Sequence, residues 1–169
     1  MVMVQLSLLR WLRGGRGCRL GRERVWLYRI VLPSEESAKV IEQVDGNVRA
    51  VRVIDDDVYN RWKRLRFEFY ATMKKIAVPV MRGLRLVHDE YRAEVEAYLS
   101  SVRAELEEIE REIWARMPPE LAKKLRDRES LHPARNFQWL PLSVEICRED
   151  FQKLLALLRG DEEEEGGKE

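Results

Sequence analysis

The sequence predicts an α+β fold, mainly α, with a long antiparallel αα-hairpin of coiled-coil type, a C-terminal helix and a small N-terminal antiparallel β-sheet. Apolar residues recur at alternating steps of three and four between residues 55 and 117, and again after residue 143. Before residue 55 they alternate with polar residues or form β-branched runs. A length of 169 residues favours a single domain, which we assign to residues 1–160. Its parts are the sheet with a short helix, the hairpin, and a loop with the C-terminal helix, over residues 1–54, 55–117 and 118–160.

The sheet is predicted from three apolar runs. Residues 2–8 and 25–32 alternate as strands do, and residues 48–54 are rich in β-branched side chains. A basic loop over residues 13–23, which contains four glycines, separates the first two strands. Residues 34–44 begin with a serine, a good N-cap, and continue with an apolar edge, so we expect a short helix there. This order predicts a three-stranded sheet with helices on one face.

The first helix of the hairpin is predicted over residues 55–76. Three aspartates at its start suit the positive end of the helix dipole, and two lysines in its last turn suit the negative end. Its apolar heptad positions, together with those of the second helix, are called the seam below. In this first helix the seam consists of Val58, Trp62, Leu65, Phe69, Thr72 and Ile76.

The second helix is predicted over residues 89–117, and Pro118–Pro119 ends it. Its seam consists of Val95, Leu99, Val102, Leu106, Ile109 and Ile113. A narrow apolar seam on a long helix has to be buried against another helix. The connection over residues 77–88 fits a turn with a short strand at 84–87, so the simplest solution is an antiparallel hairpin within one chain. The alternative is one bent helix that pairs with a second copy of the protein.

The remainder of the chain is predicted as a short polar helix over residues 120–128, an ordered aromatic loop over 129–141 and a helix over 143–159. Gly160 is expected to end that last helix. Its apolar positions form a third heptad series that is expected to cover the hairpin: Val144, Cys147, Phe151, Leu154 and Leu158. Residues 161–169 hold six acidic residues and are expected to be a disordered tail.

Charge is strongly polarised along the chain, although the formal net charge is only +1. Residues 1–29 carry seven arginines against one glutamate, which is opposite in sign to the acidic tail. Abundant paired charges and few amides are typical of proteins from hot environments, but a GC-rich genome would also favour arginine. The sequence therefore suggests a thermophile without distinguishing the two explanations.

The two cysteines are isolated. Cys18 and Cys147 form no C-x-x-C motif and no even framework, so we expect two thiols and no disulfide. Arginines around Cys18 would favour its thiolate, whereas Cys147 is assigned to the core. The first twelve residues are too short and too interrupted for a secretory or membrane segment, so a cytoplasmic protein with no membrane association is expected.

The basic loop is the strongest functional feature of the sequence. Guanidinium groups beside tryptophan rings are the combination used to bind phosphates and stacked bases of single-stranded nucleic acid. The residues that we assign to nucleic-acid binding are Arg13, Arg16, Arg19, Arg22, Trp11 and Trp26. The same loop can instead contact an acidic patch on a protein partner, or it can be a solvated tip.

Two acidic clusters raise the alternative of a metal-dependent enzyme. Asp55–Asp57 could hold a divalent cation, and His88–Glu90 offers an imidazole beside two carboxylates. Both clusters are explained equally well by helix capping. The two histidines are not at metal-ligand spacing, and no nucleophile motif is present, so we predict no catalytic residue, no metal, no cofactor and no small-molecule substrate.

The function predicted from these features is non-catalytic. We expect an interaction or scaffolding protein that assembles with itself or a protein partner through its helical seams, while the basic loop contacts a polyanion. The residues that we assign to the interface are Trp62, Phe69, Leu99, Leu106, Ile113 and Trp114. Trp114 lies just off the seam and is expected at a binding surface. The first alternative is a nucleic-acid-binding accessory subunit of a ribonucleoprotein, virus or plasmid.

Overall fold

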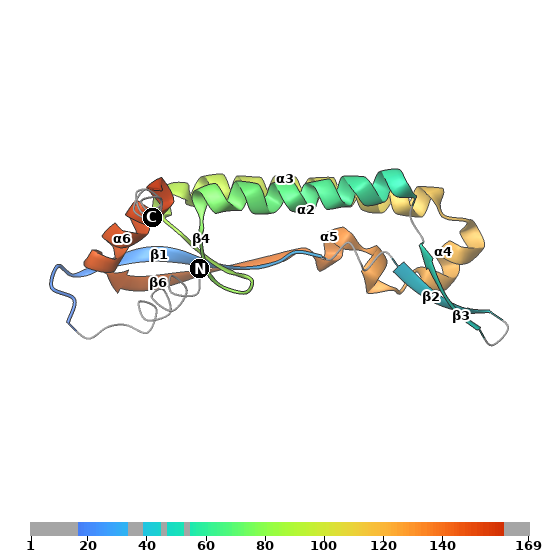
Figure 1. The fold of residues 1–169 in the computed structure, drawn as a ribbon, viewed down its shortest axis with the longest axis horizontal. Helices are drawn as coiled ribbons and strands as arrows, with labels where there is room; N and C mark the ends of the chain where they lie inside the picture. The colour runs from blue at the N-terminus through green and yellow to red at the C-terminus, as the bar shows by residue number, and fades with distance from the viewer. Residues whose placement is uncertain (1–16, 34–38, 45–46, 53–54, 161–169) are drawn as a thin grey trace, which may run out of the picture. The chain divides into compact units, whose positions relative to one another are not determined.

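The computed structural model describes residues 17–33, 39–44, 47–52 and 55–160. The fold is α+β, with helices as the larger part (Figure 1). Contacts divide the chain into two compact units. We call them the sheet unit (Met1–Ile30, Ala71–Ala97, Trp139–Glu169) and the helix unit (Val31–Tyr70, Tyr98–Gln138), and each is described separately.

The sheet unit is built on a four-stranded antiparallel sheet in the order β4-β5-β1-β6. The strands are β1 (Arg22–Val31), β4 (Val78–Met81), β5 (Leu84–Val87) and β6 (Gln138–Cys147). In the register between β1 and β5, Trp26 faces Val87 and Leu27 faces Leu86. Gly83 closes the tight turn between β4 and β5 with a φ of 79°, which only glycine adopts readily.

The predicted N-terminal sheet is therefore only partly correct. The strand expected over residues 25–32 is β1, but its neighbours come from the chain between the two long helices and from the C-terminal region. The strand expected over 48–54 is β3 (Asn47–Arg52), which pairs with β2 (Lys39–Val44) in a separate two-stranded sheet. The helix expected over residues 34–44 is wrong at residues 39–44, which form β2. Two valines and an isoleucine there favour an extended chain. The strand predicted over residues 2–8 lies outside the described residues.

The core of the sheet unit lies between the sheet and helix α6 (Arg148–Arg159). The buried side chains of this core are Val25, Val78, Val80, Leu86, Ile146 and Leu154. The helix predicted over residues 143–159 is correct only from Arg148 onward, because Ser143–Cys147 belong to β6. The predicted third heptad series is thus divided between a strand and a helix, and Leu154 packs on the sheet. Gly160 ends α6 in the left-handed conformation, as predicted.

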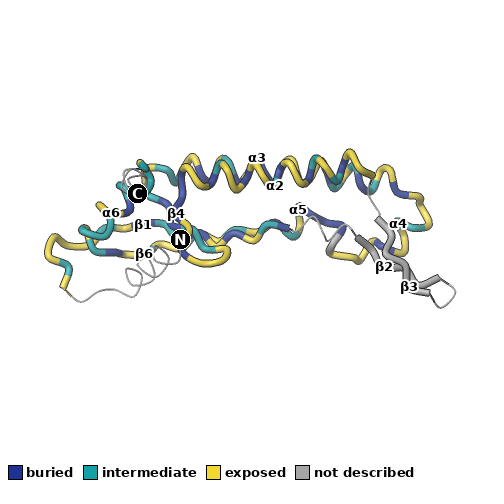
Figure 2. The backbone as a smooth tube through the Cα atoms, viewed as in Figure 1, coloured by how far each residue is buried: buried dark blue, intermediate teal, exposed yellow. Residues whose placement is uncertain are grey.

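The two long helices are α2 (Asp56–Ile76) and α3 (Arg92–Arg116). Buried and exposed residues alternate along both of them, and Figure 2 shows this on the helix nearer the viewer. Every seam position predicted on α3 is at most 3% exposed. On α2 the predicted seam is buried except at Thr72, where the neighbouring Met73 is fully buried instead. The longer apolar side chain takes the core position, because burying it gains more free energy than burying threonine.

Short elements fill the rest of the described chain: η2 (Asp89–Tyr91), α4 (Pro119–Leu125), η3 (Glu129–Leu131) and α5 (Pro133–Asn136). The short helix predicted over residues 120–128 corresponds to α4. The loop predicted over residues 129–141 is instead η3, α5 and the start of β6. Among the described residues, no helix has the length and apolarity that a membrane span requires.

Candidate functional site

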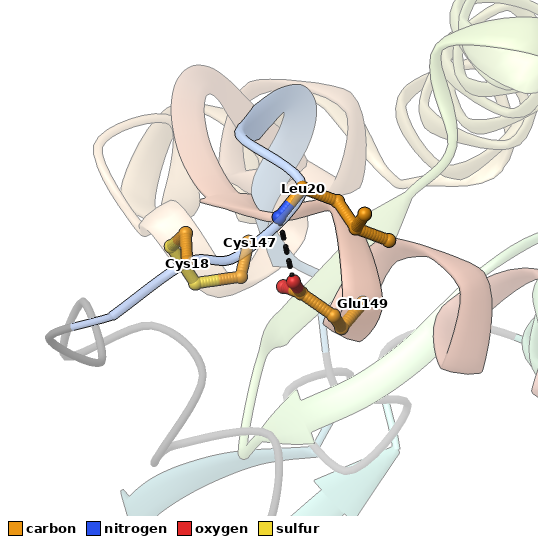
Figure 3. Close-up of a disulfide and its surroundings, with 4 residues drawn as sticks. All are labelled: Cys18, Leu20, Cys147 and Glu149. Atoms are coloured by element: carbon orange, nitrogen blue, oxygen red, sulfur yellow. Dashed lines mark hydrogen bonds between the residues drawn. A yellow bond between two sulfur atoms is a disulfide. The ribbon is translucent and has the colours of Figure 1, made fainter.

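The start of β1 is tied to the start of α6 by a disulfide between Cys18 and Cys147 (Figure 3). The prediction of two free thiols is therefore wrong. Because β1 and β6 are antiparallel neighbours, the beginning of one lies beside the end of the other, and this brings together cysteines 129 positions apart. Nothing in the local spacing of either cysteine indicates this pairing.

Hydrogen bonds reinforce the disulfide. The Leu20 N–H donates to Glu149 Oε1 at 2.9 Å, as drawn in Figure 3, and the Arg148 N–H donates to the Gly21 carbonyl at 2.9 Å. Backbone N–H groups of Glu149 itself, Leu20 and Arg19 hold the pKa of the Glu149 carboxyl below its ordinary value. Residues 18–21 are thus fixed against the N-terminal end of α6.

The residues assigned to nucleic-acid binding have different environments. Arg19 and Arg22 are exposed at the entrance to β1, and Arg24 follows them on the strand. Trp26 is half-buried, donates its indole N–H to Asp89 Oδ1 at 2.7 Å, and has the Arg92 guanidinium 3.5 Å from its ring centroid. Its ring is therefore already engaged by protein side chains. Trp11, Arg13 and Arg16 lie outside the described residues.

A second contact between β1 and α3 lies beside Trp26. The fully buried Tyr28 donates its hydroxyl proton to Glu96 Oε1 at 2.9 Å, and Arg92 Nε donates to the same oxygen at 3.3 Å. Burial, followed by the hydrogen bond to Glu96 and its charge, raises the pKa of Tyr28 to about 12.

This pKa predicts a loss of stability at high pH. In the unfolded chain tyrosine ionises near pH 10, so between about pH 10 and pH 12 the unfolded state gives up a proton that the folded state keeps. The free energy of unfolding should therefore fall as pH rises through this window. Urea denaturation at a series of pH values should show a shallower fall for Tyr28→Phe than for the exposed control Tyr70→Phe. Equal slopes for the two variants would contradict this assignment.

The residues assigned to the interface are buried within the chain, with one exception. Trp62, Phe69, Leu99, Leu106 and Ile113 are each at most 3% exposed. Their side chains are therefore not exposed on the surface of the chain. Trp114 is the exception, because it is half-buried and lines a cleft in the helix unit.

This cleft has a volume of about 540 Å³ and lies between one face of α3 and the short helix α5. Its lining residues are Arg103, Glu107, Glu110, Arg111, Trp114, Ala134 and Arg135. Three guanidinium groups, two carboxylates and one indole make the cleft mixed in character, with a cationic excess. Sequence reasoning selected Trp114 but did not connect it with these charged side chains.

His132 is the residue of this region that sequence reasoning missed. It is only 6% exposed, its Nδ1 lies 2.7 Å from Glu110 Oε1, and its Nε2 lies 2.9 Å from the Arg126 carbonyl oxygen. A carbonyl only accepts, so Nε2 carries a proton. Both ring nitrogens are thus engaged by protein atoms, and the role of His132 is to join α3 to the chain around α5. The centroid of the Trp114 ring lies 5.1 Å from the centroid of the His132 imidazole, and the two ring planes are 34° apart.

The two acidic clusters have structural roles in the described chain. Asp55 accepts from the Val58 N–H at 3.1 Å and pairs with Arg116. The Val58 N–H, and secondarily Arg116, hold the pKa of Asp55 below its ordinary value. His88 Nδ1 accepts from the Glu90 N–H at 3.0 Å and so caps η2.

A smaller cleft of about 460 Å³ is lined by Glu23, Arg24, His88, Asp89, Glu90 and Phe151. Within the part of the chain that the structure describes, no three His, Cys, Asp or Glu side chains are grouped so that they could hold a metal ion. The metal-dependent alternative therefore gains no support from these residues. A scan against protein-family models, a search of curated proteins and a search of solved structures find no match to this sequence.

Proposed function

We propose that the protein is a non-catalytic interaction protein in which a helical hairpin, closed within one chain, carries a basic N-terminal segment that contacts a polyanion. The observation that carries this proposal is the contrast between the two predicted binding regions. The seam is buried inside the chain, whereas Arg19, Arg22 and Arg24 are exposed beside a disulfide. The segment that carries these three arginines, called the basic segment below, is therefore exposed to a partner, whereas the seam is not.

The hairpin is supported by contacts between the beginning of α2 and the end of α3. Arg61 pairs with Glu108 at 2.9 Å and with Glu112 at 2.6 Å, and Asp55 pairs with Arg116. Further along α2, the Phe69 ring stacks on the Tyr98 ring of α3, with 6.1 Å between the ring centroids. Residue numbers rise on α2 as they fall on α3, which is the order expected for antiparallel helices. Together with the buried heptads, these contacts favour coiled-coil packing within the chain.

The polyanion role is supported by the way in which the basic segment is held. The disulfide and the Leu20–Glu149 hydrogen bond fix the backbone next to Arg19 and Arg22, so these side chains project from an anchored chain. An anchored cationic segment loses less conformational entropy on binding than a free one. We infer that the ligand is a single-stranded nucleic acid. Exposed arginines can neutralise its phosphates without a groove and without contacts to specific bases.

Salt-dependent binding tests this function. Fluorescence anisotropy with oligo(dT) should show affinity that falls steeply with salt for the natural chain. Replacing Arg19, Arg22 and Arg24 by Ser should lower the slope of log affinity against log salt by about 2, since each phosphate contact contributes about 0.7. The matched control replaces three exposed cations of α2, Arg64, Lys74 and Lys75, by Ser and should leave the slope nearly unchanged. Equal effects of the two triple variants would contradict a specific role for the basic segment.

A further inference from the structure

The cleft of the helix unit is lined by one indole, three guanidinium groups and two carboxylates. We propose that it binds a ribonucleotide, with the base stacked on Trp114, the phosphate on Arg111 and Arg135, and the sugar hydroxyls on Glu107. This inference does not rest on the polyanion function proposed above, because none of its residues belongs to the N-terminal segment.

The position of the cleft follows from the helical repeat. Its residues on α3 include Arg103, Glu107, Glu110 and Trp114, each one place after a buried seam residue. They form a polar stripe beside the seam, and α5 supplies Ala134 and Arg135 opposite. The volume of about 540 Å³ lies within the range of small-molecule sites, roughly 300–1,000 Å³.

Trp114 supplies a surface for a flat ring. Its indole is half-buried and is supported by the His132 imidazole, whose ring centroid is 5.1 Å away. His132 is in turn held by Glu110 and the Arg126 carbonyl. Because this support already orders the indole, a stacking ligand loses little entropy in fixing it.

The charges of the cleft divide into engaged and available groups. Glu110 is engaged by His132, and Arg103 donates to the Phe137 carbonyl at 2.8 Å. Arg111, Arg135 and Glu107 are exposed, and none of the described residues forms an ion pair or hydrogen bond with them. Two available cations suit a phosphate, whose oxygens accept several guanidinium N–H donors.

Glu107 determines the class of ligand. A carboxylate beside the two arginines repels a bare anion but accepts hydrogen bonds from sugar hydroxyls, as acidic residues do in dinucleotide sites. A ligand that uses all three available groups and the indole therefore has a flat ring, hydroxyl donors and a phosphate. That chemistry occurs both in a free ribonucleotide and in one unit of single-stranded RNA.

Tryptophan fluorescence titration with ADP tests the proposal, with adenosine, pyrophosphate and oligo(A) as separate arms. ADP should quench saturably and bind at least tenfold more tightly than adenosine or pyrophosphate. Tighter binding of oligo(A) than of ADP would identify RNA as the source of the nucleotide, and weaker binding would identify the free nucleotide. Absence of saturable ADP binding by titration calorimetry would overturn the proposal.

Variants locate the binding. The double variant Arg111→Ser, Arg135→Ser should bind ADP at least tenfold more weakly and bind adenosine with unchanged affinity. The control Arg64→Ser, which removes a matched exposed cation of α2, should leave the affinity for ADP unchanged. Trp114→Leu should remove the quench. If that variant does not fold, the exposed arginine variants still decide the question. If the double arginine change leaves ADP binding unaffected, the proposed site is wrong. The variant with Arg19, Arg22 and Arg24 replaced by Ser should bind ADP normally. That result separates this test from the test of the polyanion function.

Discussion

Reduction of the Cys18–Cys147 disulfide is expected to lower the free energy of unfolding by about 2–5 kcal/mol. The two cysteines are 129 positions apart, so the bond closes most of the chain into a loop and removes many conformations from the unfolded state. Urea denaturation with and without a reductant measures the difference directly. The midpoint should shift to lower urea under reduction.

The control for this experiment is the double variant Cys18→Ser, Cys147→Ser. It should have the stability of the reduced natural chain and should not respond to the reductant. Full reduction of the natural chain should be confirmed by thiol counting. If its urea midpoint then stays unchanged, the bond has no stabilising role.

The disulfide also connects two expectations drawn from composition. Disulfides persist mainly in oxidising compartments, with intracellular proteins of hyperthermophiles as the main exception. A cytoplasmic location, which stays a prediction, is therefore compatible with this bond chiefly if the suggested hot environment is also correct.

Leu106→Ala is expected to lower the free energy of unfolding by about 2–5 kcal/mol, because it removes a side chain that is only 1% exposed in the seam. Denaturation of the natural chain and the variant at several protein concentrations also tests where the hairpin closes. If the seam closes within one chain, both midpoints are independent of concentration.

Leu140→Ala is the matched control, since Leu140 is 54% exposed and its loss should change stability by about 0.5 kcal/mol or less. A midpoint for the natural chain that rises with protein concentration would show that the seam is shared between copies. The alternative of a bent helix pairing with a second molecule would then replace the closed hairpin.

The local pattern of the sequence determined the long helices. Seam residues such as Leu99 and Ile113 recur at steps of three and four, and such a stripe is buried whichever partner covers it. The stop at Pro118 and the cap at Asp55 are equally local, because each acts through the backbone of its own turn. Trp114 could be recognised as a special position because it lies one place beyond the seam.

Tertiary structure alone decided the sheet, the disulfide and the cleft. Short apolar runs such as Lys39–Val44 and the start of the predicted last helix fit a strand or a helix, and pairing with a distant strand resolves them. Cys147 meets Cys18, and His132 meets Glu110, only because antiparallel strands or packed helices bring them together. Periodicity in a sequence indicates which face of an element is buried, but it does not indicate which other element covers that face. The elements could therefore be predicted where burial alone defines them, whereas their partners and the cleft required the folded chain.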